Sequence, residues 1–341
     1  MTVTRRAVLG TAAALGAPRF AFAQGQYKAE YKMSTVVPPA FAWGKGGEIF
    51  ATLVRERTAG RIHIKQYPGA SLVQGQQDRE FSAMRQGIVD VLCGAPINWT
   101  STVPQLGLFT LPFLMPDHKA WDAVMASEAV TKDYFDLVRK AGAEPLAIGE
   151  TGYRQISNSR RPVLRPDDLK GLKIRVVGSP MYGDIMTSMG GNPTFMSWAD
   201  AQPALSTGAV DGQENPLSIF VTAKLHTVSQ KYVTLWGYVA DPLIFVVNKQ
   251  VWDSWSADDQ KAVREAAEQA GKEEIILARK GLMAGDDAVL KEVQAAGVTV
   301  VQLTPQEKKA FQTATRPIYD KWAKQIGPDL VQKAEAAVAA R

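Results

Sequence analysis

An arginine lies in the middle of a short apolar run at residues 173–177. The run is predicted to be a β-strand, in which Ile174 and Val176 share one face and Arg175 points from the other. A guanidinium keeps its charge in a protein, so one that points inward requires an anion. If no acidic side chain of the protein supplies that anion, a ligand does. The strand therefore predicts a buried sheet that carries an anion-binding group.

Helical and strand patterns alternate along the whole chain, which predicts an α/β fold. Strand patterns cover residues 29–34, 61–67, 89–92, 145–149, 173–177 and 243–247, and helical patterns cover residues 41–59, 78–86 and 200–207. Ser256 is predicted to cap a long helix that reaches about Leu290, with Gly271 and Gly285 as candidate break points. Such a helix, on the order of 50 Å long, can cross between two lobes. Two lobes are also expected from the length, which is large for one core.

The first 23 residues have the pattern of a signal peptide. Arg5 and Arg6 precede an apolar stretch at residues 7–17, and residues 21–23 form an Ala-x-Ala cleavage signal that leaves Gln24 as the mature N-terminus. The paired arginines favour twin-arginine export, with an ordinary secretory signal as the alternative. The apolar stretch, about 11 residues long, is too short to span a bilayer.

The charge of the mature chain does not favour nucleic-acid binding. Lys and Arg number 39 against 34 Asp and Glu. Three of the basic residues, Arg5, Arg6 and Arg19, lie in the predicted signal peptide, which leaves the mature chain close to neutral. Nucleic-acid binding needs a clustered basic face. No later apolar run reaches the length of a membrane span, so we do not expect the mature protein to be membrane-embedded.

Motifs of enzymes and metal sites are not found in the sequence. Cys93 is the single cysteine, so no intrachain disulfide can form, and we interpret it as a small buried hydrophobe. The three histidines, His63, His118 and His226, are far apart and lack the spacing of metal ligands. We therefore expect no metal, no cofactor and no catalysis.

Six short segments and one single residue occur in the order typical of one family. They are residues 69–72, 86–90, 111–113, 153–158, 168–176 and 209–216, and Asn248. The chain resembles the substrate-binding proteins of tripartite ATP-independent periplasmic (TRAP) transporters, the DctP-like family. The segments 168–176 and 209–216 together are specific for this resemblance, and the matching pieces span most of the mature chain.

The resemblance implies a two-lobed α/β clamp with a mixed sheet in each lobe and a long helix over both. Lobe I would comprise residues 24–151 and about 240–280, and lobe II about 152–239 and 281–341, with the chain crossing near 150 and 240. Ligand would bind in the cleft, and the lobes would close by a hinge. The protein would be a periplasmic monomer without cofactor that delivers its ligand to an ion-gradient-driven permease.

Four residues match family positions that contact the ligand. Arg175 matches the arginine that clamps the ligand carboxylate, which a guanidinium holds through two parallel charge-assisted hydrogen bonds. Arg154 matches a second arginine and Asn215 an asparagine near the same carboxylate, while Trp198 matches an aromatic residue against the ligand body. The alternatives are a structural salt bridge for Arg175, a surface loop position for Arg154 and a core position for Trp198. The rest of residues 211–216 is expected to shape a turn.

Further candidates follow the predicted strands, because ligands of open α/β sheets bind at strand carboxyl ends. They are Pro39, Phe41 and Trp43 after the first strand, Asn98 and Trp99 after the strand at 89–92, Glu150 and Tyr153 at the first crossing, and Trp236, Tyr238 and Asp241 at the second.

The ligand is predicted to be a monocarboxylate with an apolar or aromatic body, such as a 2-oxo or 2-hydroxy acid, because several tryptophans are candidates. Ala95 stands where the sialic-acid binders of this family carry a glutamate, which disfavours that sugar. A C4-dicarboxylate, with Arg154 on the second carboxylate, is the main competitor, and Glu150 could receive an amine or hydroxyl. Two other functions stay open: a sensory binding protein, and an exported isomerase with Glu150 or Asp241 as general base.

Overall fold

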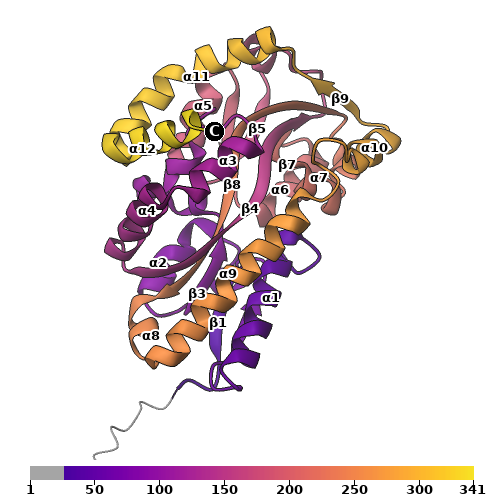
Figure 1. The fold of residues 1–341 in the computed structure, drawn as a ribbon. Coiled ribbons are helices and arrows are strands. Elements are labelled where there is room, and N and C mark those ends of the chain that lie inside the picture. The colour runs from indigo at the N-terminus through magenta and orange to yellow at the C-terminus, as the bar shows by residue number, and fades with distance from the viewer. Residues whose placement is uncertain (1–26) are drawn as a thin grey trace, which may run out of the picture.

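The computed structural model describes residues 27–341, and the predicted signal peptide lies outside this range. One mixed sheet of nine strands forms the centre of the molecule, in the order β2-β1-β3-β8-β4-β7-β5-β6, with β9 paired to β8 (Figure 1). The strands are β1 (Tyr31–Ser34), β2 (Ile64–Tyr67), β3 (Val91–Gly94), β4 (Ala143–Asn158), β5 (Lys173–Val176), β6 (Asn192–Phe195), β7 (Gly212–Pro216), β8 (Tyr232–Asn248) and β9 (Thr299–Gln302). The predicted α/β fold is confirmed.

The strands β4 and β8 connect the two halves of the sheet. They pair antiparallel over almost their whole length, from Ala143↔Asn248 to Asn158↔Tyr232. At one end β8 pairs with β3, and at the other β4 pairs with β7. The register shifts between Glu150 and Gly152, at the middle of β4. Such a bulge bends a strand and increases its twist. The chain therefore crosses between the halves near residues 150 and 240, within two strands much longer than those predicted.

Twelve α-helices are found in the described part of the chain. They are α1 (Ala42–Arg57), α2 (Glu80–Arg85), α3 (His118–Ala126), α4 (Glu128–Lys140), α5 (Pro180–Ser188), α6 (Trp198–Thr207), α7 (Leu217–Thr222), α8 (Lys249–Asp253), α9 (Ala257–Arg279), α10 (Ala288–Ala295), α11 (Pro305–Ile326) and α12 (Pro328–Ala339). None of the helices within residues 27–341 combines the length and apolar character needed to cross a membrane.

The long helix α9 begins as predicted and ends earlier. The Ser256 hydroxyl accepts a hydrogen bond from the backbone N–H of Asp259, as an N-cap residue does. The helix continues through Gly271 and ends at Arg279, rather than near Leu290. Gly281 follows with a φ of +76°, in the left-handed region, which terminates a right-handed helix.

Helix α9 runs beside α1 and passes over β4 (Figure 1). The close approach depends on two glycines that face Glu274 of α9. A Cβ at Gly46 of α1 would lie 2.6 Å from Glu274 Cγ, and one at Gly149 of β4 would lie 2.5 Å from Glu274 Oε2. The Glu274 carboxylate oxygen accepts a hydrogen bond from the Glu150 backbone N–H at 2.9 Å. The helix is thereby fixed to the middle of the strand that joins the halves.

The C-terminal helices pack against both predicted lobes. Helix α11 contacts α5, and α12 contacts α3 and α4. The predicted lobe II includes α12, whereas α3 and α4 belong to the predicted lobe I. The C-terminal segment therefore straps the two parts together, and the division into lobes remains a prediction.

The segment 211–216 is not a turn, as was expected, but mostly a buried strand. β7 lies between β4 and β5. A Cβ at Gly212 would lie 2.2 Å from the Ser157 carbonyl oxygen, so this position accepts only glycine. The strand pattern was missed because Gly, Asn and Pro are depleted in strands. Its consequence is that Glu214 and Asn215 stand beside Arg154 of β4.

The buried Glu274 generates a prediction about pH. Burial raises the pKa of its carboxyl well above the ordinary range. Between the unfolded and folded pKa values, the folded protein binds one more proton than the unfolded chain. Its stability therefore falls as pH rises, by up to about 1.4 kcal/mol per pH unit.

We expect Glu274→Gln to be more stable than the wild type at pH 8 by about 1 kcal/mol or more, because the amide stays neutral. The difference should shrink towards about pH 4, where the wild-type carboxyl is protonated in the folded state and largely protonated in the unfolded chain. Urea denaturation at several pH values measures this, and identical pH profiles for both proteins would contradict it.

Candidate functional site

Arg175 of β5 is a buried cation without an acidic partner. Its side chain is 1% exposed. The Nε donates to the Met196 carbonyl oxygen at 3.0 Å, whereas Nη2 is buried and has no hydrogen-bond partner. The guanidinium lies 5.8 Å from the centre of the Trp198 ring. Burial lowers the pKa of Arg175 to about 10, because the charged form has lost water. The side chain therefore presents an uncompensated positive charge and a free donor.

Arg154 of β4 is buried too, but its charge is compensated. It forms ion pairs with Glu214 and with Asp241. Its Nη2 also donates to the Glu214 carbonyl oxygen at 2.6 Å and to Asn215 Oδ1 at 3.1 Å. Burial alone would lower the pKa of Arg154, but the two carboxylates raise it above its ordinary range. These contacts leave at most one N–H, on Nη1, for a ligand.

Glu214, which pairs with Arg154, is fully satisfied by the protein. It is 0% exposed, and Oε2 also accepts a hydrogen bond from the Tyr238 hydroxyl at 2.7 Å. The ring of Tyr182 lies 5.4 Å from the Arg154 guanidinium. Glu214 thus holds Arg154 in place directly, and Tyr238 does so through its hydrogen bond to Glu214.

A small cavity lies where these side chains meet, and the centre of a water molecule can occupy about 20 Å³ of it. Its polar wall comprises Gln77, Asn98, Thr151, Arg154, Arg175, Asn215 and Asp241, and its apolar wall Val36, Val37, Trp43, Ala95, Val177, Trp198 and Ile219. Both halves of the sheet contribute to the wall. The cavity thus brings together seven of the predicted site residues.

Gln77 and Thr151 are lining residues that the sequence did not indicate. Gln77 Nε2 donates to Asn98 Oδ1 at 2.8 Å, and Gln77 Oε1 accepts from the Trp198 backbone N–H at 2.8 Å. The hydroxyls of Thr100 and Ser179 are joined at 2.8 Å. These bonds connect segments on opposite sides of the cavity. No local motif marks Gln77, so only the three-dimensional arrangement reveals it.

Three aromatic candidates lie in the core and not at the cavity. Trp99 is 1% exposed, and its ring centre lies 5.4 Å from that of Phe81. Trp236 is 0% exposed and stacks between Tyr238, at 4.7 Å, and Phe311, at 5.5 Å. Tyr238 reaches the site only through Glu214. Of the tryptophan candidates, Trp43 and Trp198 line the cavity.

Glu150 and Tyr153 take part in a separate polar cluster. Glu150 pairs with Arg279 of α9 at 2.6 Å, and its other oxygen lies 3.1 Å from His118 Nδ1. The Tyr153 hydroxyl donates to the Asp117 carbonyl oxygen at 2.6 Å. Glu150 thus holds the end of α9, and Tyr153 holds the start of α3, near the crossing.

The remaining candidates, Pro39 and Phe41, line a hollow on the surface beside α7 and α10. The single cysteine, Cys93, is fully buried, as predicted. Within residues 27–341, no group of His, Cys, Asp and Glu side chains has the arrangement of a metal site.

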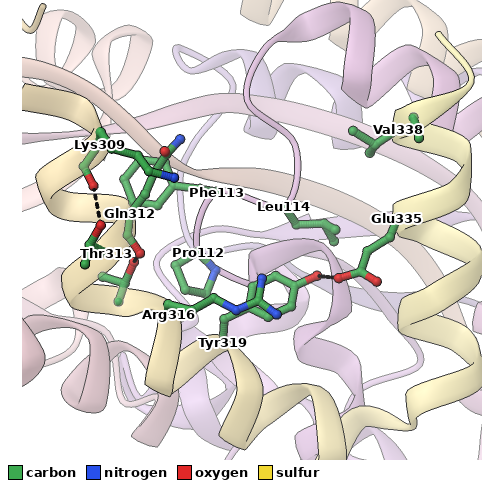
Figure 2. Close-up of a pocket in the computed structure, with 12 residues that line it drawn as sticks. Pro112, Phe113, Leu114, Lys309, Gln312, Thr313, Arg316, Tyr319, Glu335 and Val338 are labelled. Atoms are coloured by element: carbon green, nitrogen blue, oxygen red, sulfur yellow. Dashed lines mark hydrogen bonds between the residues drawn. The ribbon is translucent and has the colours of Figure 1, made fainter. Parts of the chain in front are cut away.

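A larger groove lies between α11, α12 and the segment before α3 (Figure 2). The Tyr319 hydroxyl donates to Glu335 at 2.6 Å, and the Arg316 guanidinium lies 4.7 Å from the centre of the Tyr319 ring. Among the described residues, none of the buried polar atoms that lack a partner belongs to this groove. The cavity at Arg175, which does hold such atoms, is therefore the stronger candidate site.

Comparison with known proteins identifies the class of protein. Residues 33–325 match the family of bacterial extracellular solute-binding proteins, family 7, also called DctP. The 2,3-diketo-L-gulonate-binding periplasmic protein YiaO of Escherichia coli K12 is 32% identical over 290 residues, which covers 83% of this chain and 84% of that protein.

Two solved structures of TRAP periplasmic solute-binding proteins have the same fold. One, from Ralstonia eutropha H16 with bound (S)-2-acetolactate, is 61% identical with a TM-score of 0.90 and covers 92% of this chain and 100% of that chain. Another, from Sulfurospirillum deleyianum with bound succinate, is 29% identical with a TM-score of 0.81. It covers 92% of this chain and 99% of that chain.

This chain belongs to the DctP family of TRAP transporter solute-binding proteins, as its motifs predicted. Members of this family are periplasmic binding proteins that capture small organic acids and work with permeases; they are not enzymes. The alternative of an exported isomerase is thereby set aside.

The contrast between the two arginines generates a prediction about stability. Arg154→Met leaves Glu214 and Asp241 buried without their partner, and breaking a buried ion pair in this way costs about 3–5 kcal/mol. Arg175→Met removes a charge that has no acidic partner, so we expect a loss below about 1 kcal/mol. Urea denaturation of the ligand-free proteins measures both values. Equal losses would contradict the assignment of Arg154 as the structural arginine.

Proposed function

We propose that this protein captures a short, branched monocarboxylate with an oxygen substituent next to the carboxylate, such as a 2-hydroxy or 2-oxo acid. The observation that carries the proposal is the unpaired, buried guanidinium of Arg175 at the cavity. A ligand carboxylate would supply the missing anion and accept the free Nη2 donor. Charge-assisted bonds of this kind contribute roughly 1.5–3 kcal/mol each.

The charges around the cavity favour one carboxylate over two. Arg154 is paired with Glu214 and Asp241, so of the two guanidiniums only Arg175 lacks an anionic partner. A second carboxylate would have to approach Arg154, whose acceptors are already provided by the protein. It would bring an additional buried charge without a cation, which is costly. This supports a monocarboxylate over the C4-dicarboxylate alternative.

The size and the apolar wall of the cavity favour an aliphatic body. The cavity is small, and Val36, Val37, Val177 and Ile219 contribute branched aliphatic side chains to it. Trp43 and Trp198 provide flat covers for apolar atoms. The acetolactate bound to the Ralstonia eutropha relative is a branched monocarboxylate of this kind. We therefore favour a branched aliphatic acid over an aromatic one or a sugar acid.

The partner and the location follow the family. We propose that residues 1–23 are a signal peptide cleaved after Ala23, and that the mature monomer delivers its ligand to the membrane subunits of a TRAP permease. The family membership supports this, and Arg5, Arg6 and the Ala-x-Ala sequence at residues 21–23 support export. A sensory binding protein would share the fold and differ in its partner.

The ligand proposal predicts the outcome of a titration series. Isothermal titration calorimetry of the mature protein should give tight binding for (S)-2-acetolactate and for C5 2-hydroxy or 2-oxo acids. Succinate and a hexonate should bind far more weakly, because one brings a second charge and the other brings several hydroxyls against a largely apolar wall. Succinate binding more tightly than every monocarboxylate would overturn the proposal.

Substitution of the proposed carboxylate receptor predicts a loss of affinity. Arg175→Lys should weaken binding of the best acid by about 1–3 kcal/mol, because lysine cannot form two parallel bonds to a carboxylate. Arg161→Lys is the matched control, since Arg161 is an exposed arginine of the same half whose side chain bonds only backbone carbonyls. Unchanged affinity in Arg175→Lys would refute its role as the receptor.

A further inference from the structure

Three buried polar atoms that lack a hydrogen-bond partner belong to side chains that line the cavity. They are Arg175 Nη2, Asn98 Nδ2 and Asp241 Oδ1. Each of the three side chains is at most 2% exposed. A buried polar atom without a partner costs about 1–3 kcal/mol, so such atoms are rare and their clustering calls for an explanation. Two of the atoms are donors and one is an acceptor.

The free atom of Asn98 is a donor because of a chain of bonds that begins at a backbone N–H. The Trp198 N–H can only donate, so the Gln77 atom that faces it is the oxygen Oε1. The other end of Gln77 is then the NH₂ group, which donates to Asn98 Oδ1. The Asn98 amide is thereby oriented with Nδ2 unengaged. The hydrogen-bond chain thus determines which end of the Asn98 amide is the NH₂ group.

The free atom of Asp241 is an acceptor because its other oxygen is bound. Oδ2 accepts from Arg154 Nη1, with which Asp241 forms an ion pair. An ionised carboxylate has no proton to donate, so Oδ1 requires a donor from whatever fills the cavity. The backbone carbonyl of Asp241 is engaged separately, by the Thr151 hydroxyl at 3.0 Å.

We propose that Asp241 and Asn98 determine which acid is bound, Asp241 by accepting from a ligand hydroxyl and Asn98 by donating to a second ligand oxygen. This inference rests on the proposed function, in which Arg175 holds the carboxylate. The three free atoms then match a carboxylate, one hydroxyl donor and one carbonyl acceptor on the same small molecule. The acetolactate bound to the Ralstonia eutropha relative, 2-hydroxy-2-methyl-3-oxobutanoate, carries these three groups.

A hydroxyl suits the free acceptor better than an ammonium group does. An ammonium carries three N–H donors, whereas Asp241 Oδ1 is the unengaged buried acceptor among the side chains lining the cavity. Two donors of an amino acid would therefore lack side-chain acceptors. A 2-oxo group would place a carbonyl oxygen against the Asp241 carboxylate, where two acceptors repel. The site is thereby specific for a hydroxyl at this position.

The test of Asp241 uses three acids of equal size: 2-hydroxy-, 2-oxo- and 2-amino-3-methylbutanoate. The wild-type protein should bind the 2-hydroxy acid roughly 10- to 100-fold more tightly than the 2-oxo acid, as expected for one hydrogen bond to a charged group. In Asp241→Asn the Arg154 donor orients the amide oxygen towards itself, so the NH₂ faces the cavity. The preference for the 2-hydroxy acid should then vanish or reverse.

Asp259→Asn is the matched control, because Asp259 is likewise 2% exposed and ion-paired to an arginine, Arg61, but does not line the cavity. It should keep the wild-type preference. Calorimetry gives the ratios, and the thermal midpoint of each ligand-free variant shows whether it is folded. If Asp241→Asn does not fold, the wild-type ratio decides, since equal affinity for the 2-hydroxy and 2-oxo acids overturns the inference.

The test of Asn98 compares (S)-2-acetolactate with 2-hydroxy-2-methylbutanoate, which lacks only the keto oxygen. The wild type should prefer acetolactate about 10-fold, the value of one good hydrogen bond at a buried donor. Asn98→Asp keeps the acceptor for Gln77 and removes the donor, so both anions should weaken and their ratio should approach one. A ratio unchanged in this variant would overturn the role of Asn98.

The outcomes separate this inference from the proposed function. Equal wild-type affinity for the 2-hydroxy and 2-oxo acids, with binding still lost in Arg175→Lys, would overturn the role of Asp241 and leave the carboxylate site intact. Tighter binding of the 2-amino acid than of the 2-hydroxy acid would also overturn it. Failure of every acid to bind, or binding unaffected by Arg175→Lys, would overturn the proposed function itself.

Discussion

The ion-paired cluster of Arg154, Glu214 and Asp241 is the constraint on which the rest of the site depends. Its members come from β4, β7 and β8, three neighbouring strands of the sheet, at the point where the chain passes between the halves. Because a guanidinium in the interior must be compensated, the three strands are held in one register. The same network uses one oxygen of Asp241 and leaves the other free at the cavity. In the proposed recognition scheme, one oxygen of Asp241 has a structural role and the other contacts the ligand.

Arg175, unlike Arg154, is a buried charge without an ion-pair partner among the described residues. The neighbouring strand β5 carries it into the same region, yet no carboxylate of the described residues pairs with it. Burial lowers the pKa of Arg175, because the charged guanidinium has lost its hydration. Two arginines of similar burial thus have different functions, and the difference lies in the partners supplied by β7 and β8. We propose that protein stability rests on the compensated arginine and that ligand affinity depends on the uncompensated one.

Much of the architecture was accessible from the sequence, and the division of roles was not. The period of β5 indicated an inward Arg175, and the Ser256 cap located the start of α9. The pairing of Arg154 depends on β7, whose Gly, Asn and Pro residues conceal a strand, and sequence separations of 60 and 87 residues leave no local signal. Trp236 was a candidate binding residue, but it lies in the core. The candidate was wrong because periodicity cannot distinguish a core aromatic residue from one that lines a cavity. Gln77 was missed for the same reason, since its role arises from a contact 121 residues away.

Under the proposed function, the unpaired charge of Arg175 would also link ligand binding to closure of the two halves of the molecule. The cavity wall combines segments from both halves of the sheet, and Gln77 and Thr100 bond across it to Trp198 and Ser179. In a conformation in which the halves were apart, Arg175 would be hydrated, and closing would remove that water. Without an anion, desolvation of the guanidinium opposes closure, whereas a carboxylate replaces the lost hydration and tips the balance. A neutral molecule of the same shape would gain the apolar contacts but leave the charge unpaired. If Arg175 is the carboxylate receptor, as we propose, its burial makes closure conditional on an acid.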